Sequence, residues 1–329
     1  MADVLEPVAA GLWSVRVPIP KSPLRYVFAY VFETRCGPVV VDPGWNAEES
    51  YAVLVDALVE IGASVSALYG ILVTHHHRDH SGLALRLASE SGAYIGMHQA
   101  DLEILRYPMW FADRIVAGEL AADGVPADIE AQIHAASLER FPPVVPVRAA
   151  RSLRDGEMAD LPGWHVRAIW TPGHTPGHLC FLVEGHDGPL LLTGDHVLPR
   201  ITPNVGITSE KNRNPLRDYR ASLLKVLSLA ADSQVLPAHE WPFADLPARI
   251  REIEEHHDAR LAEVRALLTE GPLTTWQLAN ALTWKNPWTT LDPLGQRSAL
   301  NETRAHVAFL RDRNEVVTTG EPLRVHALA

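Results

Sequence analysis

Val73-Thr-His-His-His-Arg-Asp-His-Ser-Gly82 follows an apolar run and contains four potential metal ligands, His75, His77, Asp79 and His80. Side chains alternate along an extended backbone, so His75 and His77 point to the same side at a strand end, whereas Asp79 and His80 fall on the following turn. A single tetrahedral ion rarely accepts four ligands from six consecutive residues. The stretch therefore predicts two metal ions rather than one.

Three later segments supply further candidate ligands, and each places one of them just past a predicted strand. They are His174 in Trp170-Thr-Pro-Gly-His-Thr-Pro-Gly-His178, Asp195 in Leu190-Leu-Leu-Thr-Gly-Asp-His196, and His239 in Val235-Leu-Pro-Ala-His-Glu240. Loops that follow the strands of a sheet gather at one of its edges, so these residues are expected to join the first four.

This order of ligands, HxHxDH followed by His, Asp and His, resembles the pattern of the metallo-β-lactamase-fold hydrolase superfamily. The resemblance covers roughly the first three quarters of the chain, and so many ordered ligands at strand ends make it specific. It implies an α/β fold, a four-layer αββα sandwich. The strand-rich segments in each half of the chain, flanked by helical segments, are what two such sheets need.

The resemblance also assigns roles to the candidate ligands. One ion would be held by His75, His77 and His174, the other by Asp79, His80 and His239, and Asp195 would bridge them. Two Zn²⁺ ions are expected, with Fe or Mn as alternatives. Water between ions roughly 3.5–4 Å apart would lose a proton near neutral pH and act as the nucleophile. Asp79 is also predicted to be catalytic, passing a proton to the leaving group.

Other polar residues near these motifs are given supporting or structural roles. The resemblance predicts that Asp42, at the end of a hairpin, supports the metal-binding loop. Four further histidines are expected not to bind metal: His76, His98, His178 and His196. The loop after Asp195 carries three basic residues that either hold an anionic group of the substrate or are simply solvated: Arg200, Lys211 and Arg213.

The leading functional hypothesis is a dinuclear zinc hydrolase of an acyl thioester, lactone or ester with an apolar portion, such as a glyoxalase II-like thioesterase. Asp195 stands where zinc β-lactamases have Cys or Ser, and His77 where di-iron oxygen reductases have Glu, so both of those activities are disfavoured. Two alternatives from other classes are a single-strand-specific endoribonuclease and a mononuclear iron enzyme that oxidises sulfur.

The chain is expected to form two domains. Residues 1–245 are assigned to the catalytic domain, in which 102–151 is an insertion that forms either a lid over the site or ordinary packed helices. Residues 246–329 contain predicted helices and a two-stranded ribbon, which resemble the small winged-helix-like domain of some superfamily members. The apolar faces with Trp276, Trp284 and Trp288 are candidates for a homodimer surface.

Composition narrows the expected partners. Hydrophobic residues make up 47% of the 329 residues and charged ones 21%, as in ordinary globular proteins. A net charge of −11 disfavours nucleic acid as a partner and leaves a small acyl compound as the expected substrate. With neither a signal peptide nor a membrane-spanning stretch in view, the cytoplasm is the expected location. Cys36 and Cys180 are predicted to be buried thiols.

Overall fold

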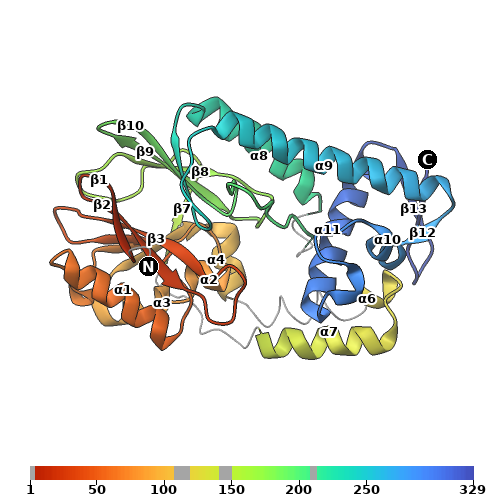
Figure 1. Cartoon of the computed structure of the whole chain (residues 1–329), viewed down its shortest axis with the longest axis horizontal. Coiled ribbons are helices and arrows are strands. Elements are labelled where there is room, and N and C mark those ends of the chain that lie inside the picture. Colours follow the sequence, from red (N-terminus) through yellow and green to blue (C-terminus); the bar gives the residue numbers. More distant parts are fainter. Residues whose placement is uncertain (1–3, 107–118, 141–149, 208–212) are drawn as a thin grey trace. The chain divides into compact units, whose positions relative to one another are not determined.

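The computed structural model describes residues 4–106, 119–140, 150–207 and 213–329 (Figure 1). These residues fall into two compact units. The first comprises the described parts of 1–106, 146–203 and 222–250, and the second those of 107–145, 204–221 and 251–329.

The first unit contains two β-sheets, whose strands are bounded as follows. One sheet has the order β1 (Leu5–Ala9), β2 (Leu12–Pro18), β3 (Tyr26–Phe32), β4 (Val39–Val41), β5 (Gly70–Leu72), β6 (Tyr94–His98) and β7 (Ala150–Leu153). The other has the order β11 (Gln234–Pro237), β10 (Gly188–Gly194), β9 (Leu179–Gly185) and β8 (Val166–Trp170). Strands β4 to β7 run parallel, as do β10 and β11, so the loops after them begin at a shared edge of each sheet.

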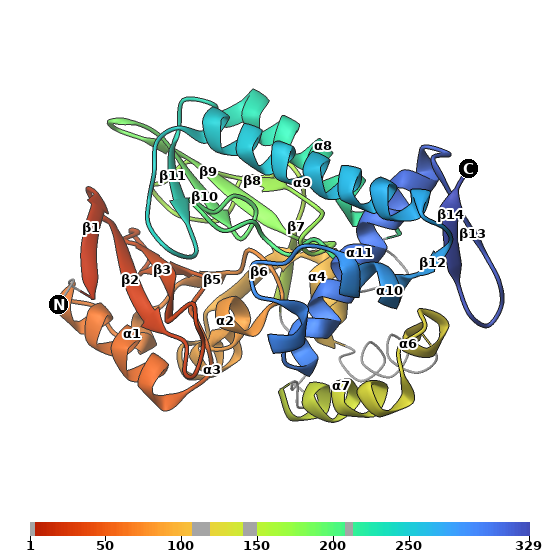
Figure 2. The same ribbon diagram turned by 45° about the vertical axis from the view of Figure 1, so that its right-hand side comes forward.

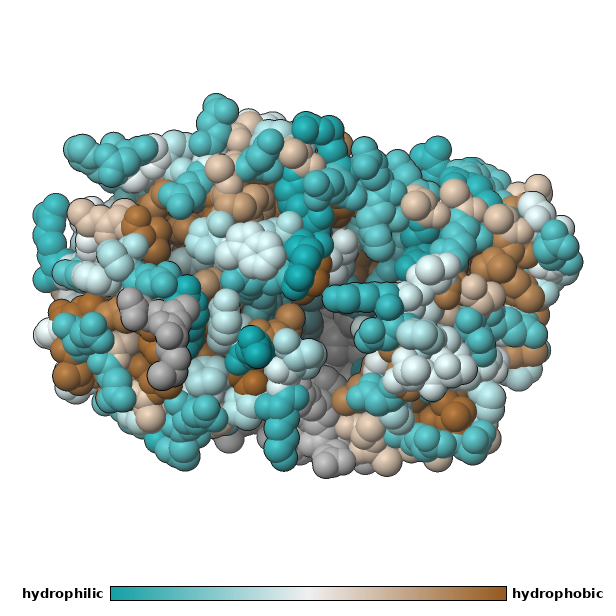
Figure 3. Space-filling model, in the orientation of Figure 1, coloured by the Kyte–Doolittle hydropathy of each residue, from teal (hydrophilic) through white to brown (hydrophobic). Residues whose placement is uncertain are grey.

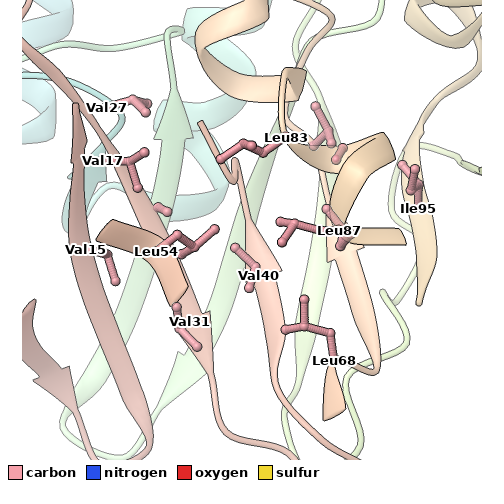
Figure 4. Close-up of a cluster of buried hydrophobic side chains, with 14 of the residues drawn as sticks. Val15, Val17, Val27, Val31, Val40, Leu54, Leu68, Leu83, Leu87 and Ile95 are labelled. Carbon is pink, nitrogen blue, oxygen red and sulfur yellow. The ribbon is translucent and has the colours of Figure 1, made fainter. Parts of the chain in front are cut away.

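Strand β3 shows why the first sheet must be covered on both faces. Its side chains alternate between two buried clusters because successive residues of a strand point to opposite faces. Val27, Ala29 and Val31 belong to one cluster, which also holds Leu54, Leu83 and Leu87 from the helical segments. Val27 and Val31 are labelled in Figure 4. Phe28, Tyr30 and Phe32 lie in the other cluster, together with residues of β8, β9 and β10. The second cluster is therefore the core between the two sheets.

Helices supply the outer layers of this unit. They are α1 (Glu48–Glu60), α2 (Arg78–Ser81), α3 (Ala84–Ser91) and α4 (Gln99–Arg106), with a 3₁₀ turn at Val65–Ala67. Leu54 of α1 and Leu87 of α3 are buried against the first sheet. Helix α8 (Pro215–Ala230) runs beside the second sheet (Figures 1 and 2). The helix–sheet–sheet–helix order confirms the predicted four-layer sandwich.

The second unit is mainly helical. It holds α6 (Glu119–Ala122), α7 (Ala127–Arg140), most of α9 (Leu246–Thr269), α10 (Thr275–Ala281), a 3₁₀ turn at Trp288–Thr290, and α11 (Pro293–Asp312). Thr274 caps α10 with a capping box: its hydroxyl accepts from the Gln277 backbone N–H, while the Gln277 side chain accepts from the Thr274 N–H. The ribbon β13 (Val316–Thr319) and β14 (Val325–Leu328) is joined by β12 (Leu273–Thr274), which the sequence did not predict.

The segment 102–151 contributes helices to this second unit. Leu120, Val125 and Ile133 share a buried cluster with Trp288 and with residues of α10 and α11. Two further tryptophans, Trp276 and Trp284, pack against the same cluster, so these rings have partners within the unit. The aromatic residues 107–111, on which the lid hypothesis rested, lie outside the described residues. The lid and the homodimer both stay predictions.

The surface of the described residues is mixed in polarity. Hydrophobic side chains are interspersed among hydrophilic ones on the face drawn in Figure 3. No helix within the described ranges is long and apolar enough to cross a membrane. Cys180 is buried as expected, but the expectation for Cys36 was wrong, because the turn after β3 exposes its thiol.

Leu87→Ala should destabilise the protein by about 2–5 kcal/mol, because Leu87 is 0% exposed and its removal leaves a cavity between α3 and the first sheet. Denaturant unfolding followed by circular dichroism would measure the change. Leu224→Ala on α8 is the matched control, since Leu224 is 62% exposed and should change the free energy of unfolding by less than about 0.5 kcal/mol. Equal effects of the two substitutions would contradict this packing.

Candidate metal centre

Both sheets deliver ligands to one place in the first unit. Strand β5 leads through Thr74 into His75 and His77, and the single-turn helix α2 carries Asp79 and His80. The second sheet supplies the remaining residues from the ends of its strands: His174 after β8, Asp195 after β10 and His239 after β11. All seven predicted ligands therefore come together, in two groups.

The first group consists of His75, His77, His174 and Asp195, whose ligating atoms lie within 4.8 Å of one another. His77 Nδ1 is 3.0 Å from His75 Nε2 and 3.0 Å from His174 Nε2. Nitrogens bound tetrahedrally to one zinc ion would be separated by about 3.3 Å. The three imidazoles thus converge as ligands of a single ion do.

The second group consists of Asp79, His80 and His239. Asp79 Oδ2 lies 3.5 Å from His239 Nε2 and 3.9 Å from His80 Nε2. His80 and His239 are almost completely buried, whereas 20% of the Asp79 side chain is exposed. Asp79 is therefore the member of this group that solvent or a substrate can reach.

Asp195 faces both groups with different oxygens. Its Oδ2 is 3.5 Å from His174 Nε2 and 3.9 Å from His75 Nε2. Its Oδ1 is 3.5 Å from His80 Nε2 and 3.4 Å from His239 Nε2. Asp195 thus lies between the two groups, and its role as a bridge between two ions stays a prediction.

Several polar atoms of the centre are buried without a hydrogen bond. Among the described residues, His80 Nε2, His239 Nε2 and Asp195 Oδ1 have no hydrogen-bond partner. Buried polar atoms are normally satisfied, and unsatisfied ones often mark an ion or water site. Because the three atoms face one another and are all good zinc ligands, the residues present fit a bound divalent metal.

The electrostatics of the two groups differ. Burial lowers the pKa of His75 and of His77 well below the ordinary value, and the neighbouring imidazoles lower it further. These rings are therefore neutral and keep a lone pair available for a metal. In His80, burial also lowers the pKa, but Asp195 and Asp42 outweigh it and hold the value well above the ordinary one. The second group thus attracts positive charge, which a divalent ion would supply.

Hydrogen bonds behind the ligands fix their orientation. Asp42 accepts from the Thr74 backbone N–H at 2.8 Å and from the Thr74 hydroxyl at 2.7 Å, and its Oδ2 lies 2.8 Å from His80 Nδ1. His239 Nδ1 is 3.0 Å from the carbonyl oxygen of Tyr26, to which it donates. Both imidazoles consequently present Nε2 to the centre. Asp42 makes the supporting contacts that were expected of it.

The four histidines predicted not to bind metal lie outside both groups. The ring of His98 stacks on Trp170, with the ring planes 9° apart. His178 Nε2 accepts a hydrogen bond from the Asp195 backbone N–H at 3.2 Å and so helps to place that residue. His76 pairs with Asp101 and His196 is fully buried.

Arg200 is engaged within the protein. Its Nε donates to Glu240 Oε1 at 2.9 Å, while Glu240 Oε2 accepts from the backbone N–H groups of Arg200 and Ile201. Through these bonds Glu240 connects the loop after Asp195 to the end of β11, close to His239. The backbone of Glu240 has a left-handed φ of 73°. Lys211 lies outside the described residues, and Arg213 is exposed within the second unit.

Known proteins share both the sequence pattern and the fold of this chain. The sequence model described as "Metallo-beta-lactamase superfamily" matches residues 22–239. The probable metallo-hydrolase YqjP of Bacillus subtilis (strain 168) is 28% identical over 283 residues, covering 82% of this chain and 84% of that protein. The probable polyketide biosynthesis zinc-dependent hydrolase BaeB of Bacillus velezensis is 25% identical over 218 residues, covering 66% of this chain and 73% of that protein.

A solved structure extends the similarity to the whole chain. The metallo-beta-lactamase family protein TTHA1429 from Thermus thermophilus is 31% identical in sequence and has a TM-score of 0.83. The similarity covers 98% of this chain and 100% of that one. The C-terminal helical region is therefore shared with that protein as well.

Substituting single candidate ligands should show how much metal binding each of the two groups contributes. His239→Ala should abolish tight binding at the second group only, whereas Asp195→Ala should weaken binding at both, because each Asp195 oxygen faces a different group. Zinc titration by calorimetry and metal analysis after desalting would measure this, with about two ions expected for the unaltered chain. Asp187→Ala, at an exposed carboxylate, is the control. Unchanged binding in Asp195→Ala would refute the shared role.

Proposed function

The chain belongs to the metallo-β-lactamase superfamily, and we propose that it is a dinuclear zinc-dependent hydrolase of acyl thioesters, lactones or esters with an apolar portion. Its relationship to metallo-hydrolases and the paired His/Asp groups support a metal-dependent hydrolase. The observation that carries the dinuclear proposal is the position of Asp195. One oxygen lies 3.5 Å from His174 and the other lies 3.4 Å from His239.

In the proposed reaction, bound ions and protein side chains would have different tasks. When bound, two divalent ions would supply a nucleophilic water near neutral pH and polarise the carbonyl oxygen of the substrate. The protein holds the ligands in place and keeps His75 and His77 neutral through burial. Neither task requires a nucleophilic Ser or Cys.

Asp79 is the residue best placed to move a proton. Burial alone would raise its pKa, but His80 and His239 hold the pKa below its ordinary value, so the carboxylate is ionised. It is also the most accessible member of its group. We assign it a proton relay: Asp79 would take a proton from the attacking water and pass it to the departing thiolate or alkoxide, in addition to its role as a candidate ligand.

Chemistry and charge support the proposed substrate class. Two bound metal ions would suit attack on a carbonyl carbon, because they would stabilise the negative charge that develops on the oxygen. A relative of this chain, BaeB, is described as a zinc-dependent hydrolase of polyketide biosynthesis, which agrees with an acyl substrate. The net charge of −11 favours a small substrate over a nucleic acid.

Zinc-loaded protein should release thiol from acyl thioesters, and release should become faster with longer acyl chains if the substrate has an apolar portion. A thiol-reactive dye would follow the reaction over a panel of thioesters, with lactones and simple esters tested in parallel. Asp195→Ala should lose at least about 100-fold in kcat/KM, whereas Asp187→Ala should match the unaltered protein. Failure to hydrolyse any member of the panel would overturn the proposed substrate class.

Asp79→Asn should reduce kcat more than its loss of metal explains, because the amide can still offer an oxygen ligand but cannot accept a proton. We expect at least about 100-fold lower kcat in samples shown by metal analysis to hold both ions. The deficit should shrink for substrates with a good leaving group, which needs no proton. Full activity in doubly loaded Asp79→Asn protein would remove the proton-transfer role.

A further inference from the structure

Asp101, in the first turn of α4, is a completely buried carboxylate that no sequence motif marked. Its Oδ2 accepts from the His76 backbone N–H at 2.8 Å and from the Thr175 hydroxyl at 2.8 Å, and lies 3.0 Å from His76 Nδ1. Its Oδ1 accepts from the Gly177 backbone N–H at 2.6 Å. One side chain thus binds two segments that lie far apart in the sequence.

These two segments carry the three imidazoles of the first group. His76 lies between His75 and His77, and Thr175 follows His174 directly. The ligands of the second group have a different carboxylate behind them, since Asp42 contacts His80. Asp42 also reaches one residue of the first group, because the Thr74 hydroxyl that it holds lies 3.0 Å from His75 Nδ1. Among the described contacts, only Asp101 joins the segment around His76 to the segment that follows His174.

The contact between Asp101 and the second segment is close. A Cβ atom on Gly177 would lie 2.5 Å from the Asp101 backbone nitrogen and 2.6 Å from Oδ1, so only glycine permits this approach. Burial raises the pKa of Asp101, but His76 and the hydrogen bonds outweigh it and lower the pKa below its ordinary value. The carboxylate is therefore charged and strengthens each bond that it accepts.

We infer that Asp101 is a positioning residue for the first metal group: it clamps the segment 75–77 against the loop 174–177, so that His75, His77 and His174 converge. Its contacts are with the neighbours of the ligands in the chain, and it acts through them. The inference rests on the metal site of the proposed function and is independent of the substrate.

Asp101→Asn keeps the shape of the side chain but replaces one acceptor oxygen by an NH₂ group, which cannot accept a hydrogen bond. The variant therefore loses either the bonds from the His76 N–H and the Thr175 hydroxyl or the bond from the Gly177 N–H. Binding at the first group should weaken by about 10- to 100-fold, with the second group unchanged. Titration with Co²⁺, followed by its visible absorption and by calorimetry, would resolve the two sites. His77→Ala and His239→Ala would identify the signal of each group.

Asp123→Asn is the matched control, because Asp123 is an equally buried carboxylate that contacts Arg304, Arg324 and Thr275 in the second unit. Both of its Co²⁺ sites should keep their affinity. If Asp101→Asn does not fold, Thr175→Val decides the question, since it removes one donor to Asp101 and should weaken the same site about fivefold.

Two outcomes would overturn the inference: unaltered binding at the first group in these variants, or equal loss at both groups. Selective loss at the first group would support it. Because the titration uses no substrate, it separates this inference from the proposed hydrolysis. A protein that binds two Co²⁺ ions but releases no thiol would contradict the proposed substrate while leaving the role of Asp101 to be decided by the titration.

Discussion

Buried negative charge at Asp195 is the constraint on which the site depends. Imidazoles from both sheets surround this carboxylate, and two of them, His80 and His239, have raised pKa values because Asp195 and its neighbours outweigh the effect of burial. A buried carboxylate is stable only when opposite charge compensates it. Protons on these imidazoles or divalent ions can both do so, and the neutral rings of His75 and His77 favour the ions.

Around this charge lies a layer of residues outside the two groups that hold the candidate ligands in place. Asp42 fixes Thr74 and His80, Tyr26 fixes His239, and His178 accepts a hydrogen bond from the backbone of Asp195. Glu240 extends the layer by securing the loop at Arg200 and Ile201. Such outer contacts fix the orientation of each ring before any ion arrives, which lowers the cost of binding.

The sequence revealed the parts of this design that depend on local pattern. The residues of the two groups followed from their spacing and from their places after strands. Asp101 and Glu240 could not be predicted in this way, because their partners lie far away in the sequence or depend on loop geometry. The packing of residues 119–140 with α10 and α11 was missed for the same reason. Periodicity shows which face of a helix is buried, but not which element covers it.

Each group draws ligands from both sheets, and this division has a thermodynamic consequence. Neither sheet alone carries a complete set of candidate ligands, so an ion held by either group would bind tightly only after the two halves of the sandwich have met. A ligand that binds only the assembled state stabilises it by about 2.7 kcal/mol when its free concentration is a hundred times Kd. The concentration of free metal around the protein would thus help to set the free energy of unfolding of the chain, independently of any catalysis.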